Sequence, residues 1–156
     1  MPGELKEGAK APPFRLPTDG GGEISLKDCA GKTLVLYFYP KDDTAGCTRE
    51  ALDFSTHIKA FEKAGAVVVG VSKDSVAKHD KFKEKHGLKV ILASDEGGKT
   101  LEAYGVWVEK SMYGRKYMGI ERATFLIDGK GVIRRIWRKV KVPGHVEDVL
   151  EAVKAL

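Results

Sequence analysis

The residue types best suited to chemistry lie together in the segment 40–50, whose central cysteine is Cys47. The segment follows a continuous apolar and aromatic run at 33–39, which predicts a strand buried on both faces. Apolar residues then recur at spacings of three and four over 51–61, which predicts an amphipathic helix. Cys47 is therefore expected in or just before the first helical turn, at the carboxyl end of a strand, where open α/β sheets bind ligands.

A cysteine at a helix start is suited to act as a nucleophile. Free backbone N–H groups and the positive end of the helix dipole favour the thiolate, which is the reactive form. Thr44 can turn its hydroxyl toward the same pocket, and Pro40 can stiffen the loop and screen the sulfur from water. A thiolate that attacks a peroxide pushes negative charge onto the departing oxygen, so the Thr44 hydroxyl, backbone N–H groups near Gly46 and Cys47, and a nearby arginine are candidate donors. The product would be a sulfenic acid, which a thiol can reduce through a disulfide.

The elements that must position this segment alternate between strands and helices. The expected order is a hairpin around 18–22, a strand at 33–39, a helix at 51–61, a strand at 66–71, a helix at 75–86, a strand at 90–93, a short helix at 98–104, a hairpin of strands at 123–127 and 132–137, and a final helix around 146–153. This alternation predicts a three-layer α/β/α sandwich with a central mixed sheet and an N-terminal hairpin. Residues 109–117 are interpreted as a polar loop that covers either the site or a partner surface.

The spacing Pro40-x-x-x-Thr44-x-x-Cys47 resembles the active-site motif of the peroxiredoxins, and residues 37–42 resemble their bacterioferritin comigratory, or peroxiredoxin Q, subfamily. The resemblance continues through segments at 70–74, 119–128 and 137–142, and so covers nearly the whole chain. It implies a thioredoxin-like fold in a single domain, residues 1–156, that reduces hydrogen peroxide and organic hydroperoxides.

The resemblance also implies a role for each matching residue. Cys47 corresponds to the peroxidatic cysteine, Thr44 to the peroxide-binding hydroxyl and Pro40 to the shield of the sulfur. Arg122 corresponds to the guanidinium that completes the pocket, although the spacing alone cannot place it near Cys47. Glu50 matches a subfamily residue that orients an arginine. The resemblance implies no cofactor, thioredoxin as the usual reductant, and a monomer. Glutaredoxin and glutathione are the other external thiols expected for the one-cysteine cycle described next.

Cys29 departs from the subfamily pattern. The second, resolving cysteine of relatives often stands five residues after the first, where this chain has Leu52, or on the following helix, where it has none. Cys29 precedes the strand at 33–39 and Cys47 follows it, a separation of roughly 20 Å for seven strand residues. A disulfide requires α-carbons within roughly 7 Å. We therefore expect Cys29 to be a structural thiol, with an intermolecular resolving role as the alternative, and a one-cysteine cycle in which an external thiol reduces Cys47.

Composition excludes several other classes. The 156 residues are 42% hydrophobic and 31% charged, typical of a soluble globular chain. The longest apolar run, 34–40, is too short to span a membrane, and residues 1–10 lack a leader-like stretch, so a cytoplasmic protein is expected. Two cysteines without C-x-x-C and scattered histidines argue against a disulfide oxidoreductase and a metal site. The net charge of +5 includes basic residues at 134–141, interpreted as a solvated strand face and not a nucleic-acid surface.

One alternative function shares the first chemical step. A peroxide sensor or redox relay would also oxidise Cys47, but would then pass the oxidation to a partner protein. The sequence does not separate this reading from a peroxidase. Turnover with a reductant does, because a sensor would stop after one equivalent of peroxide.

Overall fold

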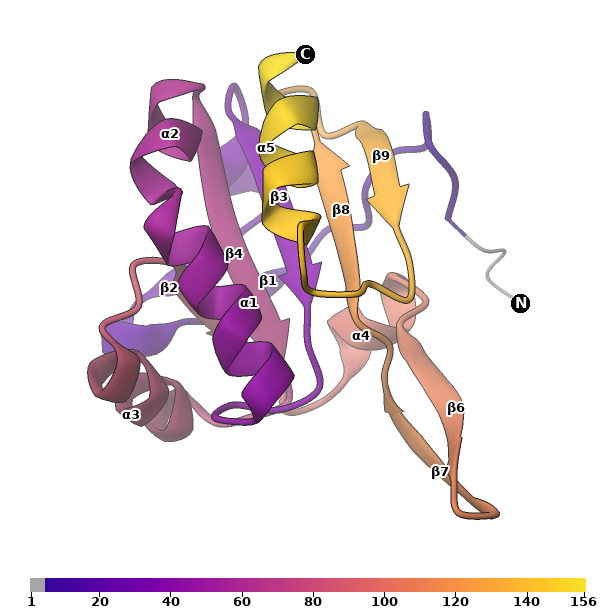
Figure 1. The fold of residues 1–156 in the computed structure, drawn as a ribbon. Helices are drawn as coiled ribbons and strands as arrows, with labels where there is room; N and C mark the ends of the chain where they lie inside the picture. Colours follow the sequence, from indigo (N-terminus) through magenta and orange to yellow (C-terminus); the bar gives the residue numbers. More distant parts are fainter. Residues whose placement is uncertain (1–4) are drawn as a thin grey trace.

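A five-stranded sheet forms the centre of the computed structural model, which describes residues 5–156 (Figure 1). Its strands lie in the order β5-β4-β3-β8-β9 and span, in that order, Ile91–Ser94, Ala66–Ser72, Thr33–Phe38, Ala123–Ile127 and Ile133–Trp137. The β3–β4 and β4–β5 pairs are parallel, whereas β3–β8 and β8–β9 are antiparallel. The predicted mixed sheet is confirmed, and the β8–β9 hairpin supplies its antiparallel part.

Helices cover both faces of this sheet. One face carries α1 (Ala45–Thr56), α2 (Ile58–Lys63), α3 (Val76–His86) and α5 (His145–Lys154). The other face carries α4 (Lys99–Ala103) and the antiparallel hairpin of β1 (Arg15–Pro17) and β2 (Glu23–Ser25) (Figure 1). The three-layer α/β/α arrangement and the N-terminal hairpin are therefore as predicted.

Strand β3 separates the two apolar cores and leads directly into the site. Its side chains alternate between the faces because successive residues of a strand point in opposite directions. Leu34, Leu36 and Phe38 join the cluster under α4, whereas Val35, Tyr37 and Tyr39 join the cluster under α1 and α5. A strand buried on both faces carries apolar residues at every position, which is why residues 33–39 form a continuous apolar run.

The helix predicted over residues 51–61 is interrupted. Helix α1 ends at Thr56 and α2 begins at Ile58, so His57 separates them. The backbone N–H of His57 donates to the carbonyls of Asp53 and Phe54, and its ring Nδ1 lies 3.0 Å from the Asp53 carbonyl oxygen. A side chain that hydrogen-bonds to the backbone of the preceding turn competes with the regular helical pattern. This competition was not visible in the apolar periodicity.

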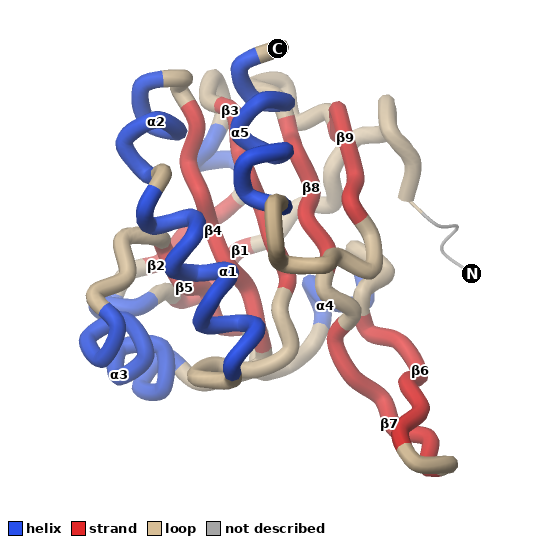
Figure 2. Tube along the Cα trace, in the orientation of Figure 1, coloured by secondary structure: helices blue, strands red, loops and turns tan. Residues whose placement is uncertain are grey.

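Residues 107–120 form a hairpin, and the prediction of a polar loop at 109–117 is wrong. Strands β6 (Trp107–Met112) and β7 (Arg115–Ile120) pair antiparallel in a separate two-stranded sheet. Figure 2 shows this hairpin extending away from the central sheet. Its two turn residues, Tyr113 and Gly114, have φ of 52° and 77°, as a tight hairpin turn requires. Tyrosine seldom adopts positive φ, so the usual Asn-Gly or Asp-Gly turn signal is missing from the sequence.

Three further expectations from the sequence concern a leader peptide, a membrane span and a metal site. Residues 1–4, part of the segment expected to lack a leader peptide, lie outside the described residues. Within residues 5–156, no helix has the length and apolar character needed to cross a membrane. Among the same residues, no three His, Cys, Asp or Glu side chains form a group that could hold a metal ion.

Candidate active site

Cys47 is the third residue of α1 and lies between that helix and the sheet. Only 1% of its surface is exposed, and it belongs to the same apolar cluster as Tyr37, Ala51 and Phe54. The backbone N–H groups of the first residues of a helix have no acceptor within the helix, and they carry its partial positive charge. The structure therefore confirms the predicted position of Cys47 at the start of a helix.

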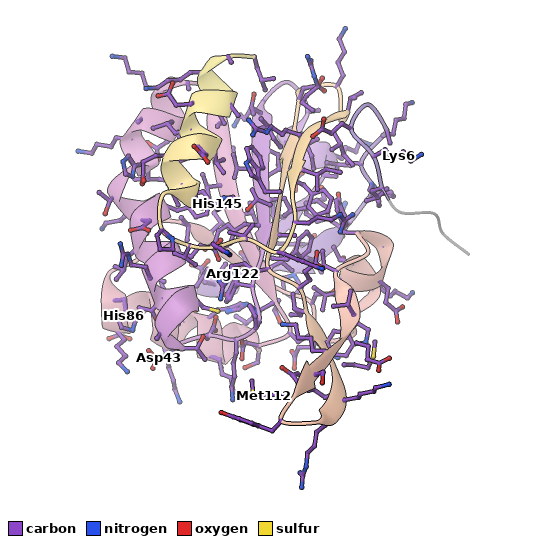
Figure 3. All side chains as sticks on the ribbon, turned by 45° about the vertical axis from the view of Figure 1, so that its right-hand side comes forward. Lys6, Asp43, His86, Met112, Arg122 and His145 are labelled. Atoms are coloured by element: carbon purple, nitrogen blue, oxygen red, sulfur yellow. The ribbon has the colours of Figure 1, made fainter. Side chains whose placement is uncertain are left out.

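Arg122 supplies a full positive charge at this sulfur. It lies between β7 and β8, 75 residues from Cys47 in sequence, and its Nη2 donates to the Cys47 Sγ over 3.3 Å. The Arg122 side chain, which is labelled in Figure 3, is 16% exposed. Gly46 leaves room for it, because a Cβ added at residue 46 would lie 3.2 Å from Nη2. Burial opposes the charged form, but Glu50 and Cys47 together raise the pKa of Arg122 above its ordinary value.

Glu50 holds the same guanidinium from the other side. Its Oε1 accepts a hydrogen bond of 2.7 Å from Arg122 Nη1, and the side chain is fully buried. Burial raises the pKa of Glu50 to about 7, although Arg122 acts in the opposite direction. Among the described residues, neither Glu50 Oε2 nor the nearby buried hydroxyl of Tyr37 has a hydrogen-bond partner. Arg122 is thus fixed by two groups one helical turn apart on α1.

Thr44 and Pro40 lie in the loop that joins β3 to α1. Thr44 is the N-cap residue of α1, and its hydroxyl donates to the Lys41 carbonyl over 2.9 Å. Because the hydroxyl proton is used in this bond, the lone pairs of the oxygen are free to accept a hydrogen bond. Pro40 is half-buried and forms a bend two residues after the end of β3.

Cys29 lies away from this site. It ends a short 3₁₀ helix, Lys27–Cys29, before β3, and it packs in the core cluster on the face of the sheet opposite Cys47. Both cysteines are free and buried. Burial, with a further contribution from Asp28, raises the pKa of the Cys29 thiol. Its position and its environment agree with the expectation of a structural thiol.

Two residues near the site were not expected from the sequence. Lys110 projects from β6, and burial, together with the charge of Arg122, lowers its pKa, while Cys47 opposes that shift. His145 begins α5, and its Nε2 lies 2.8 Å from the Thr124 hydroxyl. Figure 3 labels it at the start of α5. Burial lowers the pKa of His145 to about 4, so the ring is neutral at pH 7. Neither residue stands in a recognisable motif, and only the folded structure brings both within electrostatic reach of Arg122.

Comparison with known proteins gives a consistent result. The profile of the AhpC/TSA family matches residues 8–136. A putative peroxiredoxin bcp of Coxiella burnetii is 54% identical over 146 residues, covering 94% of this chain and 97% of the relative. Peroxiredoxin Bcp of Bacillus subtilis is 51% identical over 150 residues, covering 96% of each chain.

Solved structures agree with the fold. A Xanthomonas campestris peroxiredoxin Q superposes with a TM-score of 0.87 at 48% identity, covering 91% of this chain and 90% of the other. The C47S mutant of a Xylella fastidiosa PrxQ superposes with a TM-score of 0.93 at 41% identity, covering 99% and 98%. The thioredoxin-like fold expected from the resemblance is confirmed. The chain therefore belongs to the AhpC/TSA family and is a peroxiredoxin, an enzyme of the thiol peroxidase class.

Proposed function

We propose that Cys47 is the peroxidatic cysteine and that it reduces hydrogen peroxide and organic hydroperoxides through a sulfenic acid. The observation that carries this proposal is the 3.3 Å hydrogen bond from Arg122 Nη2 to the Cys47 sulfur, with the same guanidinium tied to Glu50. A fixed cation beside a sulfur at a helix N-terminus stabilises both the thiolate and the charge that develops as the O–O bond breaks. The X. campestris relative is described by its alkyl peroxide reduction activity, which supports the same chemistry here.

In the first step the Cys47 thiolate attacks the hydroxyl oxygen of the hydroperoxide. The S–O bond forms as the O–O bond breaks, the sulfur becomes a sulfenic acid, and the departing alkoxide takes up a proton to leave as an alcohol or as water. The Thr44 oxygen accepts the hydrogen bond of the attacked O–H group, since its own proton is held by the Lys41 carbonyl. Arg122 and the free N–H groups of the first turn of α1 stabilise the departing charge, and Pro40 limits access of water to the sulfur.

In the second step an external thiol returns the enzyme to its resting state. One thiol displaces water from the sulfenic acid to form a mixed disulfide, and a second thiol releases Cys47 as a disulfide forms between the two reductant sulfurs. Thioredoxin, glutaredoxin and glutathione all supply such thiols. Cys29 takes no part, because it lies on the opposite face of the sheet in an environment that disfavours its thiolate. The enzyme acts as a monomer of one domain, residues 1–156, in the cytoplasm.

The test is addition of limiting hydrogen peroxide to the fully reduced protein, with the state of each sulfur followed by mass spectrometry. Cys47→Ser and Cys29→Ser variants serve as matched controls. We expect fast peroxide loss that disappears only in Cys47→Ser, and a sulfenic acid trapped on Cys47. Peroxide loss no faster than with a free thiol would refute the role of Cys47. A stoichiometric Cys29–Cys47 disulfide would refute the one-cysteine cycle alone, and a stop after one equivalent in the presence of every reductant would indicate a sensor.

A further inference from the structure

A buried acid–base pair lies beside the loop that carries Thr44. Asp42 in that loop is 9% exposed, and His79 on α3 is completely buried. The His79 Nδ1 lies 2.6 Å from Asp42 Oδ2, and the Tyr39 hydroxyl donates to Asp42 Oδ1 over 2.6 Å. On its other side, His79 Nε2 lies 2.9 Å from the carbonyl oxygen of Ala93. Asp42 occupies one of the unspecified positions between Pro40 and Thr44, and His79 lies outside the motif. The proposed peroxidase mechanism uses neither side chain.

The hydrogen-bond partners determine the protonation of this pair. A carbonyl oxygen only accepts, so Nε2 must carry a proton to bond to Ala93. A carboxylate also only accepts, so the short bond to Asp42 requires a second proton, on Nδ1 or shared with the carboxyl oxygen. The pair therefore holds one proton more than a separate carboxylate and neutral imidazole would. Burial opposes a charged ring, but the hydrogen bond and charge of Asp42, with the Ala93 carbonyl and Asp74, raise the pKa of His79 above its ordinary value.

The surroundings of His79 come from several elements. Asp42 faces it from the β3–α1 loop, Tyr39 from the end of β3, and Asp74 from the segment after β4. Four lysines line the same small cavity as Asp42 and Asp74, and these are Lys41, Lys78, Lys81 and Lys85. The carboxylates of Asp42 and Asp74 favour the charged ring, and the direct contact with Asp42 outweighs the effect of burial.

The pair is connected to the catalytic hydroxyl through one residue of backbone. The Asp42 N–H donates to Asp74 Oδ2 over 2.8 Å, so both the backbone and the side chain of Asp42 are fixed. The preceding residue, Lys41, provides the carbonyl that holds the Thr44 hydroxyl proton. The following residue, Asp43, has a φ of 60° and is paired with Lys85 and His86 of α3. The Lys41 carbonyl and the Asp42 N–H belong to the same peptide unit, so the acceptor of the Thr44 hydroxyl proton is directly bonded to the residue that His79 contacts.

We propose that His79 is a positioning residue of the peroxidase reaction: its protonated ring fixes Asp42, and through the Lys41 carbonyl it presents the Thr44 hydroxyl to the peroxide. This inference rests on the role proposed above for Thr44. Because folding raises the pKa of His79, the contribution of the pair is fully present below the ordinary histidine pKa and is lost as the pH rises through the folded one. The pair then holds the loop less firmly at alkaline pH.

The test is the single-turnover rate constant for oxidation of Cys47 by hydrogen peroxide in His79→Gln and His86→Gln. His86 is the matched control, because it lies on the same helix and pairs with the next loop residue, Asp43, at the surface. We expect His79→Gln to lower the rate constant roughly tenfold near pH 6.5, since a displaced catalytic group loses much of its effect, and His86→Gln to change it less than twofold. The ratio of the wild-type rate constant to that of His79→Gln should decrease as the pH rises.

A double-mutant cycle distinguishes positioning from general destabilisation. In a Thr44→Val background, His79→Gln should lower the rate less than twofold, because the hydroxyl through which it acts is gone. An undiminished tenfold loss in that background would overturn the proposal, as would an unchanged rate in His79→Gln alone. If His79→Gln does not fold, Asp42→Asn tests the same link, and ¹⁵N NMR of the wild type tests the pair directly. A neutral His79 ring beside an ionised Asp42 at pH 7 would also overturn the proposal. A wild type that fails to react quickly would instead refute the proposed role of Cys47.

Discussion

Replacement of Arg122 by methionine tests how much of the reactivity of Cys47 comes from one guanidinium. At 3.3 Å and an effective dielectric constant of about 20, two full unit charges interact by about 5 kcal/mol. The charge of Arg122 is shared between Cys47 and Glu50, so only part of this energy acts on the sulfur. Removal of one preorganised donor typically costs about 3 kcal/mol. We therefore expect Arg122→Met to lower the rate constant for oxidation of Cys47 roughly 100-fold.

The same substitution leaves Glu50 buried without its partner. Arg122 acts to keep Glu50 ionised, so its loss raises the pKa of that carboxyl beyond about 7, and Glu50 takes up a proton. Arg122→Met should therefore lower the free energy of unfolding only slightly relative to wild type at pH 6, and by more above pH 7. The double variant Arg122→Met/Glu50→Gln removes both charges. It should react as slowly as Arg122→Met, yet be more stable than the single variant at pH 8.

The assay is competition between the variant and a haem peroxidase for limiting hydrogen peroxide, with urea unfolding at pH 6 and pH 8 in parallel. Arg122→Lys is a further control, since lysine keeps the charge but cannot donate to Cys47 and Glu50 in the same planar geometry. We expect an intermediate rate for it. If Cys47 in the Arg122→Met variant is oxidised within threefold of the wild-type rate, the guanidinium does not activate the sulfur. An equally slow Arg122→Lys variant would point to hydrogen-bond geometry over charge.

Three other substitutions have defined outcomes. Because folding raises the pKa of Glu50 from 4.5 to about 7, the free energy of unfolding of the wild type should fall by about 3 kcal/mol relative to Glu50→Gln as the pH rises from 4.5 to 7. Urea unfolding that shows the same pH dependence of stability for the two proteins would contradict this. Gly70→Ala should destabilise the fold by about 1–3 kcal/mol, because the new Cβ would lie 2.5 Å from the buried ring of Tyr37; an unchanged melting temperature would show that the ring can move. Cys29→Ala should leave the rate of Cys47 oxidation within twofold of wild type. A large decrease of this rate in stopped-flow experiments would show that Cys29 takes part in the reaction.

The sequence alone determines most of the fold and the place of the nucleophile. Apolar runs and helical spacings identify the strands of the central sheet and most of its helices, because hydrophobic periodicity depends only on local backbone geometry. The same local reasoning places Cys47 at the start of α1. Hydrophobic periodicity does not predict the break at His57 or the β6–β7 hairpin. The first depends on one side-chain hydrogen bond and the second on one turn conformation, and neither leaves a periodic pattern in the sequence.

Tertiary structure alone decides which distant groups meet at the sulfur. Arg122 reaches Cys47 only because the antiparallel pairing of β3 with β8 brings the loop before β8 to the start of α1. Glu50 meets the guanidinium because one helical turn separates it from Cys47, but its pKa near 7 comes from burial under neighbouring elements. The Asp42–His79 pair likewise joins residues 37 positions apart. Contacts of this kind depend on how elements pack, and packing places charged groups in a low-dielectric interior where single hydrogen bonds set their protonation.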